Sequence, residues 1–315
     1  MKYIILIALF GCAIAMRQQA VAVSGRLMCG NKPAAGVKVK LWDEDDGPDP
    51  DDVLDEGYTD SNGAFHLKGS ERELTNIDPV FKVYHDCDDG IKPGQRKVKF
   101  RIPDSYISAG GVAKRVFDIG VLNLETIFPK EERDLLFNFK SSVPPHFRIR
   151  ALTRFQTYCR CAQQIKKSLD ISDMKNGIMR YILLLLSVVG FCFAMRQQAV
   201  GVTGQLMCGN KPAAGVRVKL WDEDDGIDPD DLLDEGYTDA SGNFNLKGSE
   251  RELTTIDPVF KVYHDCDDGL KPGQRKVKFR IPKSYISAGG IPKRIFNIGV
   301  LNLETIFAKE ERDLI

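Results

Sequence analysis

Histidine is scarce in this sequence, and the residue patterns of common enzyme classes are missing. The chain has 4 histidines in 315 residues, whereas general acid–base catalysis needs a proton donor and an acceptor placed together within reach of a substrate. The sequence contains no GxSxG element, no phosphate-binding glycine loop and no metalloprotease helix motif. We therefore expect a protein without catalytic activity and without a cofactor.

An excess of charge of one sign is also lacking. Lys plus Arg and Asp plus Glu both number 44, so no global field favours nucleic acid. The apolar runs stay below the roughly 18–20 residues that span a bilayer comfortably. These absences exclude a nucleic-acid-binding protein and an integral membrane protein from the expected classes.

The main positive feature is an internal repeat. Residues 16–19 recur as residues 195–198, and from there two copies align without a gap. Roughly 100 of about 120 aligned positions are identical, which is far above the similarity between units of an ordinary solenoid. A unit of this length can bury its own core. The sequence therefore predicts two tandem domains, residues 16–136 and 195–315.

Each copy follows a segment typical of a secretory signal. Residues 1–15 have a basic start, a short apolar stretch and small residues at the end, so we predict a signal peptide and a secreted, extracellular protein. Residues 179–194 repeat this pattern and begin at Met179. Three interpretations of this second segment stay open: a gene model that fuses two neighbouring genes, an internal segment cleaved or kept during secretion, and a buried apolar strand.

The connector, residues 137–178, shares nothing with either copy and is rich in Arg and Lys. A basic stretch can bind nucleic acid or an acidic membrane, but a disordered linker or translated non-coding sequence is the simpler interpretation. We assign no function to it.

Within each copy the apolar residues follow the period of β-strands. Val37, Val39 and Leu41 alternate with polar or amphipathic neighbours, as expected for a strand with one buried face. The Asn-Gly pair at 62–63 predicts a hairpin turn. About seven or eight such strands in about 120 residues predict an all-β sandwich, present twice.

Each predicted domain keeps two cysteines, and a secreted domain with an even pair favours a disulfide. A metal site with His85 and Cys87 is a weaker alternative, because neither a CxxC nor an HxxxH partner is nearby. The predicted pairs are Cys29 with Cys87 and Cys208 with Cys266.

One candidate contact surface is a basic stripe on a predicted strand. A period of two places its cations on one strand face, where they can attract anionic lipid headgroups or a protein partner. The alternative is a solvated outer face whose lysines guard an edge against strand pairing. The stripe residues are Lys97, Lys99, Arg101, Lys276, Lys278 and Arg280.

An acidic stretch between two predicted strands is a weak candidate for Ca²⁺ binding, because carboxylate oxygens are the preferred ligands of this ion. The EF-hand spacing fails, so a solvated loop extended by charge repulsion is favoured and no metal is expected. The candidate ligands are Asp43, Asp45, Asp46, Asp222, Asp224 and Asp225.

Several segments together carry a family resemblance. Residues 23–29, 32–42, 84–87, 102–107 and 117–120 resemble, in order, the strands and turns of the nematode transthyretin-like family. The second copy repeats them. This resemblance implies a transthyretin-type sandwich and secretion, but no settled biochemical role, since the family as a whole lacks one. Some members act as secreted signals or bridging factors at cell surfaces.

The chain departs from the family pattern at its cysteines. Members often carry a second pair, and the corresponding positions here hold Gly94, Leu135, Gly273 and Leu314. We therefore expect one disulfide per domain. The related hydroxyisourate hydrolases end in Tyr-Arg-Gly-Ser, whereas each domain here ends in Glu-Arg-Asp-Leu, which agrees with the expected lack of catalysis.

Two functions remain as hypotheses. The first is a secreted extracellular binding or signalling module that acts at cell surfaces through an unidentified protein or lipid. The second is an extracellular carrier of a small apolar ligand, held in a channel between subunits as in transthyretin. The carrier requires a homo-oligomer, which we expect to form through edge strands at residues 81–84 and 117–124.

Overall fold

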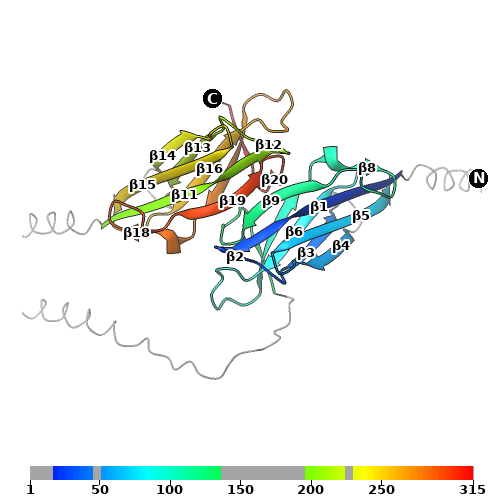
Figure 1. Ribbon diagram of the computed structural model, residues 1–315, viewed down its shortest axis with the longest axis horizontal. Helices are drawn as coiled ribbons and strands as arrows, with labels where there is room; N and C mark the ends of the chain where they lie inside the picture. The colour runs from blue at the N-terminus through cyan, green and yellow to red at the C-terminus, as the bar shows by residue number, and fades with distance from the viewer. Residues whose placement is uncertain (1–16, 45–50, 136–195, 224–229, 315) are drawn as a thin grey trace, which may run out of the picture. The chain divides into compact units, whose positions relative to one another are not determined.

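The computed structural model describes residues 17–44, 51–135, 196–223 and 230–314. The regular structure in these ranges is β, apart from short 3₁₀ turns at Asp104–Tyr106 and Lys283–Tyr285. No helix among the described residues is long and apolar enough to cross a membrane. The predicted all-β class is therefore confirmed (Figure 1). The predicted signal peptide, connector and second signal-like segment lie outside the described residues.

The two copies contain the same succession of strands, except that the second copy has one additional short strand, β20. The first copy has β1 (Arg17–Cys29), β2 (Lys32–Pro33), β3 (Lys38–Asp43), β4 (Asp52–Tyr58), β5 (Ala64–Glu73), β6 (Pro79–His85), β7 (Gln95–Arg101), β8 (Ser108–Ala109), β9 (Phe117–Asn123) and β10 (Glu132–Asp134). The second copy has β11 (Arg196–Cys208), β12 (Lys211–Pro212), β13 (Arg217–Asp222), β14 (Asp231–Tyr237), β15 (Asn243–Glu252), β16 (Pro258–His264), β17 (Gln274–Arg280), β18 (Ser287–Ala288), β19 (Phe296–Asn302), β20 (Ile306–Phe307) and β21 (Glu311–Asp313).

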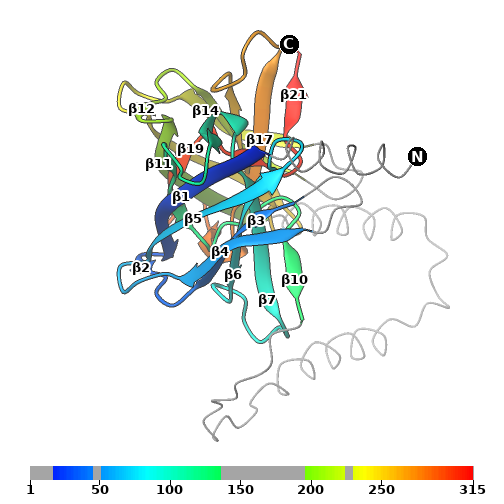
Figure 2. The same cartoon turned by 90° about the vertical axis from the view of Figure 1, so that its right-hand side faces the viewer.

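Each copy is a sandwich of two sheets. In the first copy, β1 pairs with β5 antiparallel and with β9 parallel, and the short strands β2 and β8 extend this sheet. The second sheet has the order β10-β7-β6-β3-β4, and the second copy repeats it as β21-β17-β16-β13-β14. Figure 2 shows β7 beside β10 and β17 beside β21.

The core lies between the inner faces of the two sheets. On β3 the side chains of Val39 and Leu41 are buried, while their neighbours are only partly covered, as the period-two pattern predicts. The rings of Phe65 and Phe81 stack across the core with centroids 4.5 Å apart, and Phe100 continues the stack. Such ring pairs contribute beyond the apolar area that they bury.

The predicted hairpin turn joins β4 to β5. Its Asp60 side chain accepts hydrogen bonds from the backbone N–H groups of Asn62 and Ala64, both at 2.8 Å. Gly63 has a φ of +75°, and a Cβ there would lie 2.2 Å from the Leu27 carbonyl oxygen. Glycine is therefore required at this position both by conformation and by space.

Both predicted disulfides are present. The bonds Cys29–Cys87 and Cys208–Cys266 each link the end of the first long strand of a copy to the loop after its sixth strand. Each closes a sequence separation of 58 residues, which in a chain-entropy model stabilises a domain by about 4 kcal/mol. The alternative of a metal site with His85 and Cys87 is wrong, because the Cys87 sulfur is bonded to Cys29.

One predicted edge strand is not at an edge. β6 lies between β3 and β7, and all seven of its residues are buried, so the expectation for residues 81–84 is wrong. β9 pairs with β1 on one side and with β19 of the other copy on the other side. The two copies thereby belong to one compact unit and share a sheet.

Candidate functional site

The predicted basic stripe lies on the outer face of the second sheet. Lys97, Lys99 and Arg101 alternate along β7 with buried residues, so their side chains share one face. Each has a carboxylate partner: Lys97 Nζ lies 2.9 Å from Glu132, Lys99 Nζ lies 2.9 Å from Glu44, and Arg101 pairs with Asp78. The stripe is therefore part of an ion-pair network rather than a free cationic surface.

At the centre of this network is Lys82, which was not among the residues predicted from sequence. It lies on β6, directly opposite Lys40 and Lys99 on the flanking strands. Its Nζ lies 2.5 Å from Glu44 and 3.9 Å from the centre of the Trp42 ring. Burial lowers the pKa of Lys82, and the hydrogen bond and charge of Glu44 only partly oppose this effect. The signal that could have found Lys82 is its outward register between two predicted lysine-bearing strands.

The second copy repeats the network with one rearrangement. Lys276 pairs with Glu311, and Lys278 pairs with Glu223. Asp104 of the first copy is replaced by lysine at the equivalent position 283, and this lysine binds Asp257 at 2.8 Å. Within the described ranges Arg280 then has no ion pair, because its expected carboxylate partner is engaged by Lys283. The two outer faces thus differ at one arginine, which is paired with Asp78 in the first copy and is not paired with Asp257 in the second.

The acidic candidates divide into two groups. Asp43 and Asp222 are fully buried, and each accepts a hydrogen bond of 2.6 Å from a backbone N–H, that of Asp78 or Asp257. They therefore hold the backbone between β3 and β6, or between their counterparts, instead of facing a surface cation. The other four candidates, Asp45, Asp46, Asp224 and Asp225, lie outside the described residues.

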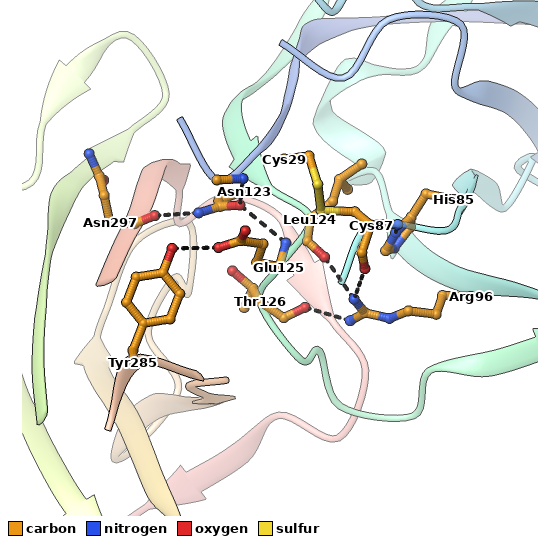
Figure 3. Close-up of a disulfide and its surroundings, with 11 residues drawn as sticks. Cys29, His85, Cys87, Arg96, Asn123, Leu124, Glu125, Thr126, Tyr285 and Asn297 are labelled. Atoms are coloured by element: carbon orange, nitrogen blue, oxygen red, sulfur yellow. Dashed lines mark hydrogen bonds between the residues drawn. A yellow bond between two sulfur atoms is a disulfide. The ribbon is translucent and has the colours of Figure 1, made fainter. Parts of the chain in front are cut away.

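Beside the disulfide, a buried arginine connects three segments (Figure 3). Arg96 is 7% exposed and donates hydrogen bonds to the carbonyl oxygens of Cys87 at 2.8 Å, Leu124 at 2.9 Å and Thr126 at 2.8 Å. It also forms an ion pair of 2.6 Å with Glu131. The loop after β6 and the segment after β9 are therefore fixed to β7 by one side chain.

The histidine that recurs in both copies lies in the core next to this arginine. His85 is 2% exposed, and its Nδ1 accepts a hydrogen bond from the Cys87 backbone N–H at 3.3 Å. Burial lowers the pKa of His85 to about 3, and the charge of Arg96 adds to the effect. His264 has the same environment and the same lowered pKa. Both rings are neutral at physiological pH and are covered from solvent, so they pack rather than exchange protons with a solute.

The loop after β6, residues 86–94, is pinned at both ends, and we call it the tip loop. The disulfide holds it at Cys87. Near its other end, Arg133 donates two hydrogen bonds to the Asp89 carboxylate and also binds the carbonyl oxygens of Pro93 at 3.2 Å and Gly94 at 3.0 Å. The same clamp holds residues 265–273 of the second copy.

The pinned tip loop presents an aliphatic side chain to solvent. Ile91 is 103% exposed, relative to its reference, and Leu270 at the same position of the second copy is 105% exposed. Scattered apolar residues are normal on surfaces, but these are fully exposed on a loop fixed by a disulfide and by an arginine. The arrangement offers a rigid apolar contact point.

Comparison with known proteins agrees with this architecture. The model of the transthyretin-like family matches the chain twice, over residues 24–103 and 203–282. In Caenorhabditis elegans, transthyretin-like protein 46 is 67% identical over 135 residues, 42% of this chain and 75% of the relative. Transthyretin-like protein 33 is 56% identical over 120 residues, 38% of this chain and 84% of the relative.

A third relative is less than half as long as this chain. Transthyretin-like protein 5 of the same organism is 49% identical over 138 residues, which are 43% of this chain and 99% of the relative. This relative is therefore long enough for one such domain but not for two. Since the family model matches both copies and each copy forms the same two-sheet sandwich, the chain belongs to the transthyretin-like family and contains two of its domains.

Proposed function

We propose that the protein is a secreted extracellular binding module that acts at cell surfaces through contacts with a protein or a lipid and performs no catalysis. Secretion is supported by the disulfide in each copy, since such bonds persist in oxidising compartments. The signal-like pattern of residues 1–15 points the same way. Membership of the transthyretin-like family agrees with both.

The observation that carries the binding role is the tip loop. An aliphatic side chain that is fully exposed contributes no apolar burial to folding, so Ile91 and Leu270 do not stabilise their own domains. Burial of one such side chain against a partner contributes about 1.5–3 kcal/mol. Because the loop is already held by the disulfide and Arg133, little conformational entropy is lost when a partner covers it.

The chemistry of the described residues supports binding over catalysis. The two recurring histidines are buried and neutral, and the lysines of the outer face are paired with carboxylates. For the carrier hypothesis, the place to look is the contact between the copies. There the rings of Phe100, Phe128, Phe279 and Phe307 pack edge to face, with centroids 5.2 to 5.9 Å apart. This packing gives the carrier no support.

The test is binding of the labelled full chain to cells and to vesicles. We expect I91S/L270S to weaken binding by about 10-fold or more, from the apolar burial that is lost. The matched control is V112S/I291S, because Val112 and Ile291 are 77% and 79% exposed but lie near the opposite end of β1 or β11. Equal binding by the wild type and I91S/L270S would contradict the proposed role of the tip loop.

Two further arms identify the kind of partner. Binding to phosphatidylcholine vesicles that contain phosphatidylserine, but not to phosphatidylcholine alone, would assign the contact to anionic lipid. Loss of cell binding after protease treatment of the cell surface, with no vesicle binding, would assign it to a protein. Absence of binding to both cells and vesicles would overturn the proposed function.

A further inference from the structure

The two copies meet edge to edge through β9 and β19. These strands pair antiparallel, with Val121 opposite Val300 at the centre of the register. Within the described part of its own copy, β9 has a strand neighbour only on the β1 side. Without the other copy, its second edge would present unpaired N–H and C=O groups, which is the type of edge that recruits another strand.

The polar contacts around this pairing occur twice, with the roles of the copies exchanged. Tyr106 donates a hydrogen bond of 2.6 Å to Glu304, and Tyr285 donates one of 2.6 Å to Glu125 (Figure 3). The side chain of Asn123 donates to a backbone oxygen of the other copy at 2.7 Å, and its counterpart at position 302 does the same at 2.8 Å. Such reciprocity is the signature of an isologous contact, in which one patch binds its own copy.

Glycine makes the close approach of the strands possible. Gly120 has a φ of +93°, and a Cβ on it would lie 2.2 Å from the carbonyl oxygen of Val300. Gly299 has a φ of +100°, and a Cβ there would lie 2.0 Å from the carbonyl oxygen of Val121. Both clashes are with backbone of the other copy, so any side chain at these positions would push the two strands apart.

An apolar contact flanks the paired strands. Phe128 packs on Phe279 of the other copy, with centroids 5.9 Å apart, and Phe307 packs on Phe100 at the same distance. Reciprocal backbone hydrogen bonds of 3.2 Å join Ile127 to Arg280. Strand pairing, charged hydrogen bonds and aromatic packing therefore act on one surface.

We propose that this surface recognises a second copy of the same domain, so that a single copy separated from the chain forms a two-fold dimer through β9–β9 pairing. The decisive observation is that the contacting side chains are identical in the two copies. Either copy can therefore take either role, and a pair of first copies retains every contact. The identical pairs are Phe100/Phe279, Tyr106/Tyr285, Gly120/Gly299, Val121/Val300, Asn123/Asn302, Glu125/Glu304, Ile127/Ile306 and Phe128/Phe307.

A single copy is a sound object for the test. It has both sheets of the sandwich, buried apolar residues between them and its own disulfide, and the family model matches it by itself over residues 24–103. We expect residues 17–135, produced alone with the disulfide formed, to sediment as a dimer. A monomeric wild-type copy at micromolar concentration would overturn the proposal.

The sharpest comparison uses two glycines of one copy. Gly110 has a φ of +101°, and a Cβ on it would have nothing within 4 Å, whereas Gly120 has a similar φ but faces the second copy. Both G110A and G120A introduce the same backbone strain, and only G120A collides with a partner. We expect G120A to be monomeric and G110A to remain dimeric. Dissociation of both variants to the same extent would contradict recognition through β9.

A covalent readout tests the register independently. In a two-fold dimer Val121 faces Val121 of the second copy, as it faces Val300 within the chain. We expect the single-copy variant V121C to form a disulfide-linked dimer on a non-reducing gel. We expect V112C, at an exposed position outside the β9 pairing, to stay unlinked. Linking of both variants alike would show random collision and would overturn the predicted register.

Discussion

The imidazole of His85 shows how burial sets the chemistry of one residue. Protonation of the ring is unfavourable, because the side chain is buried and the Arg96 guanidinium repels a second positive charge. An unfolded chain binds a proton on the same ring near pH 6.5, whereas the folded domain binds it only near pH 3. Between these values the unfolded state holds more protons, so stability rises with pH and is lost as the pH falls.

We therefore predict a loss of stability on mild acidification. Lowering the pH from about 7.5 to about 5 should reduce the free energy of unfolding by about 2 kcal/mol per domain, since the lowered histidine pKa is the dominant proton linkage in this window. Carboxylates contribute little there because they titrate near pH 4. Denaturant unfolding of the full chain at the two pH values measures the difference.

The control removes the titrating group and keeps a polar side chain of similar reach. H85Q/H264Q should have a nearly flat stability between the same pH values, even if it is less stable overall. A variant with the same pH dependence as the wild type would show that another group carries the effect. His66 is exposed and becomes Asn245 in the second copy, so H66N serves as a neutral comparison.

The ion pairs of the outer face mark the limit of prediction for single residues. The outward direction of Lys97, Lys99 and Arg101 follows from the period of the strand. Their partners do not, because Glu132 and Asp78 come from other segments of the chain and reach the stripe only in the folded sheet. The position of the basic stripe is therefore predictable from sequence, while its compensation by carboxylates is not.

Among the elements, β7 shows how one inward side chain can join several segments. Arg96 faces inward from this strand, where apolar residues are expected, and satisfies three carbonyl oxygens and Glu131. We predict that R96M lowers the free energy of unfolding by about 3–5 kcal/mol, because it leaves a carboxylate and several carbonyl groups without a partner. Chemical denaturation under oxidising conditions measures this loss.

The matching substitution on the opposite face of the same strand is K97M. Lys97 forms one ion pair with the half-exposed Glu132, and such surface pairs contribute about 0–1 kcal/mol. If K97M and R96M lowered the free energy of unfolding equally, the loss would come from a change in strand propensity and not from the contacts of the arginine. R96K should fall between them, since an ammonium group offers fewer fixed donors than a guanidinium.

Most elements could be predicted from sequence, because alternation and turn residues act locally. β3 and β7 follow their patterns, and the turn at residues 60–63 follows its Asn-Gly pair. The position of β6 could not be predicted this way. Its run of buried residues has the same appearance in a central strand as in a strand covered by another subunit. Order within a sheet depends on contacts between distant segments.

At the scale of the whole molecule, the two copies are alike in sequence, in sheet order and in disulfide. The resemblance to the transthyretin-like family also agrees with a contact between residues that are far apart in the sequence. Positions 94 and 135, where members often carry the second cysteine pair, lie next to each other in the fold: a Cβ on Gly94 would lie 2.8 Å from Leu135. For the contact between the copies, by contrast, the sequence predicted only an edge strand at residues 117–124. Its pairing with β19 depends on the folded structure of the second copy.

That contact should determine how the full chain unfolds. If one copy unfolds, the other loses its strand partner and the hydrogen bonds of Tyr106 and Tyr285, so we predict one cooperative transition with a van't Hoff enthalpy close to the calorimetric enthalpy. Because the copies are tethered, dilution should not change this ratio of the van't Hoff to the calorimetric enthalpy.

G120A/G299A should uncouple the copies and lower the ratio to about one half, as expected for two independent units. The control G110A/G289A changes glycines with the same sign of φ and no neighbour, so its ratio should stay near that of the wild type. A ratio near one half in the wild type would mean that the copies touch without stabilising one another, because a contact that carries free energy must couple the unfolding of the two domains it joins.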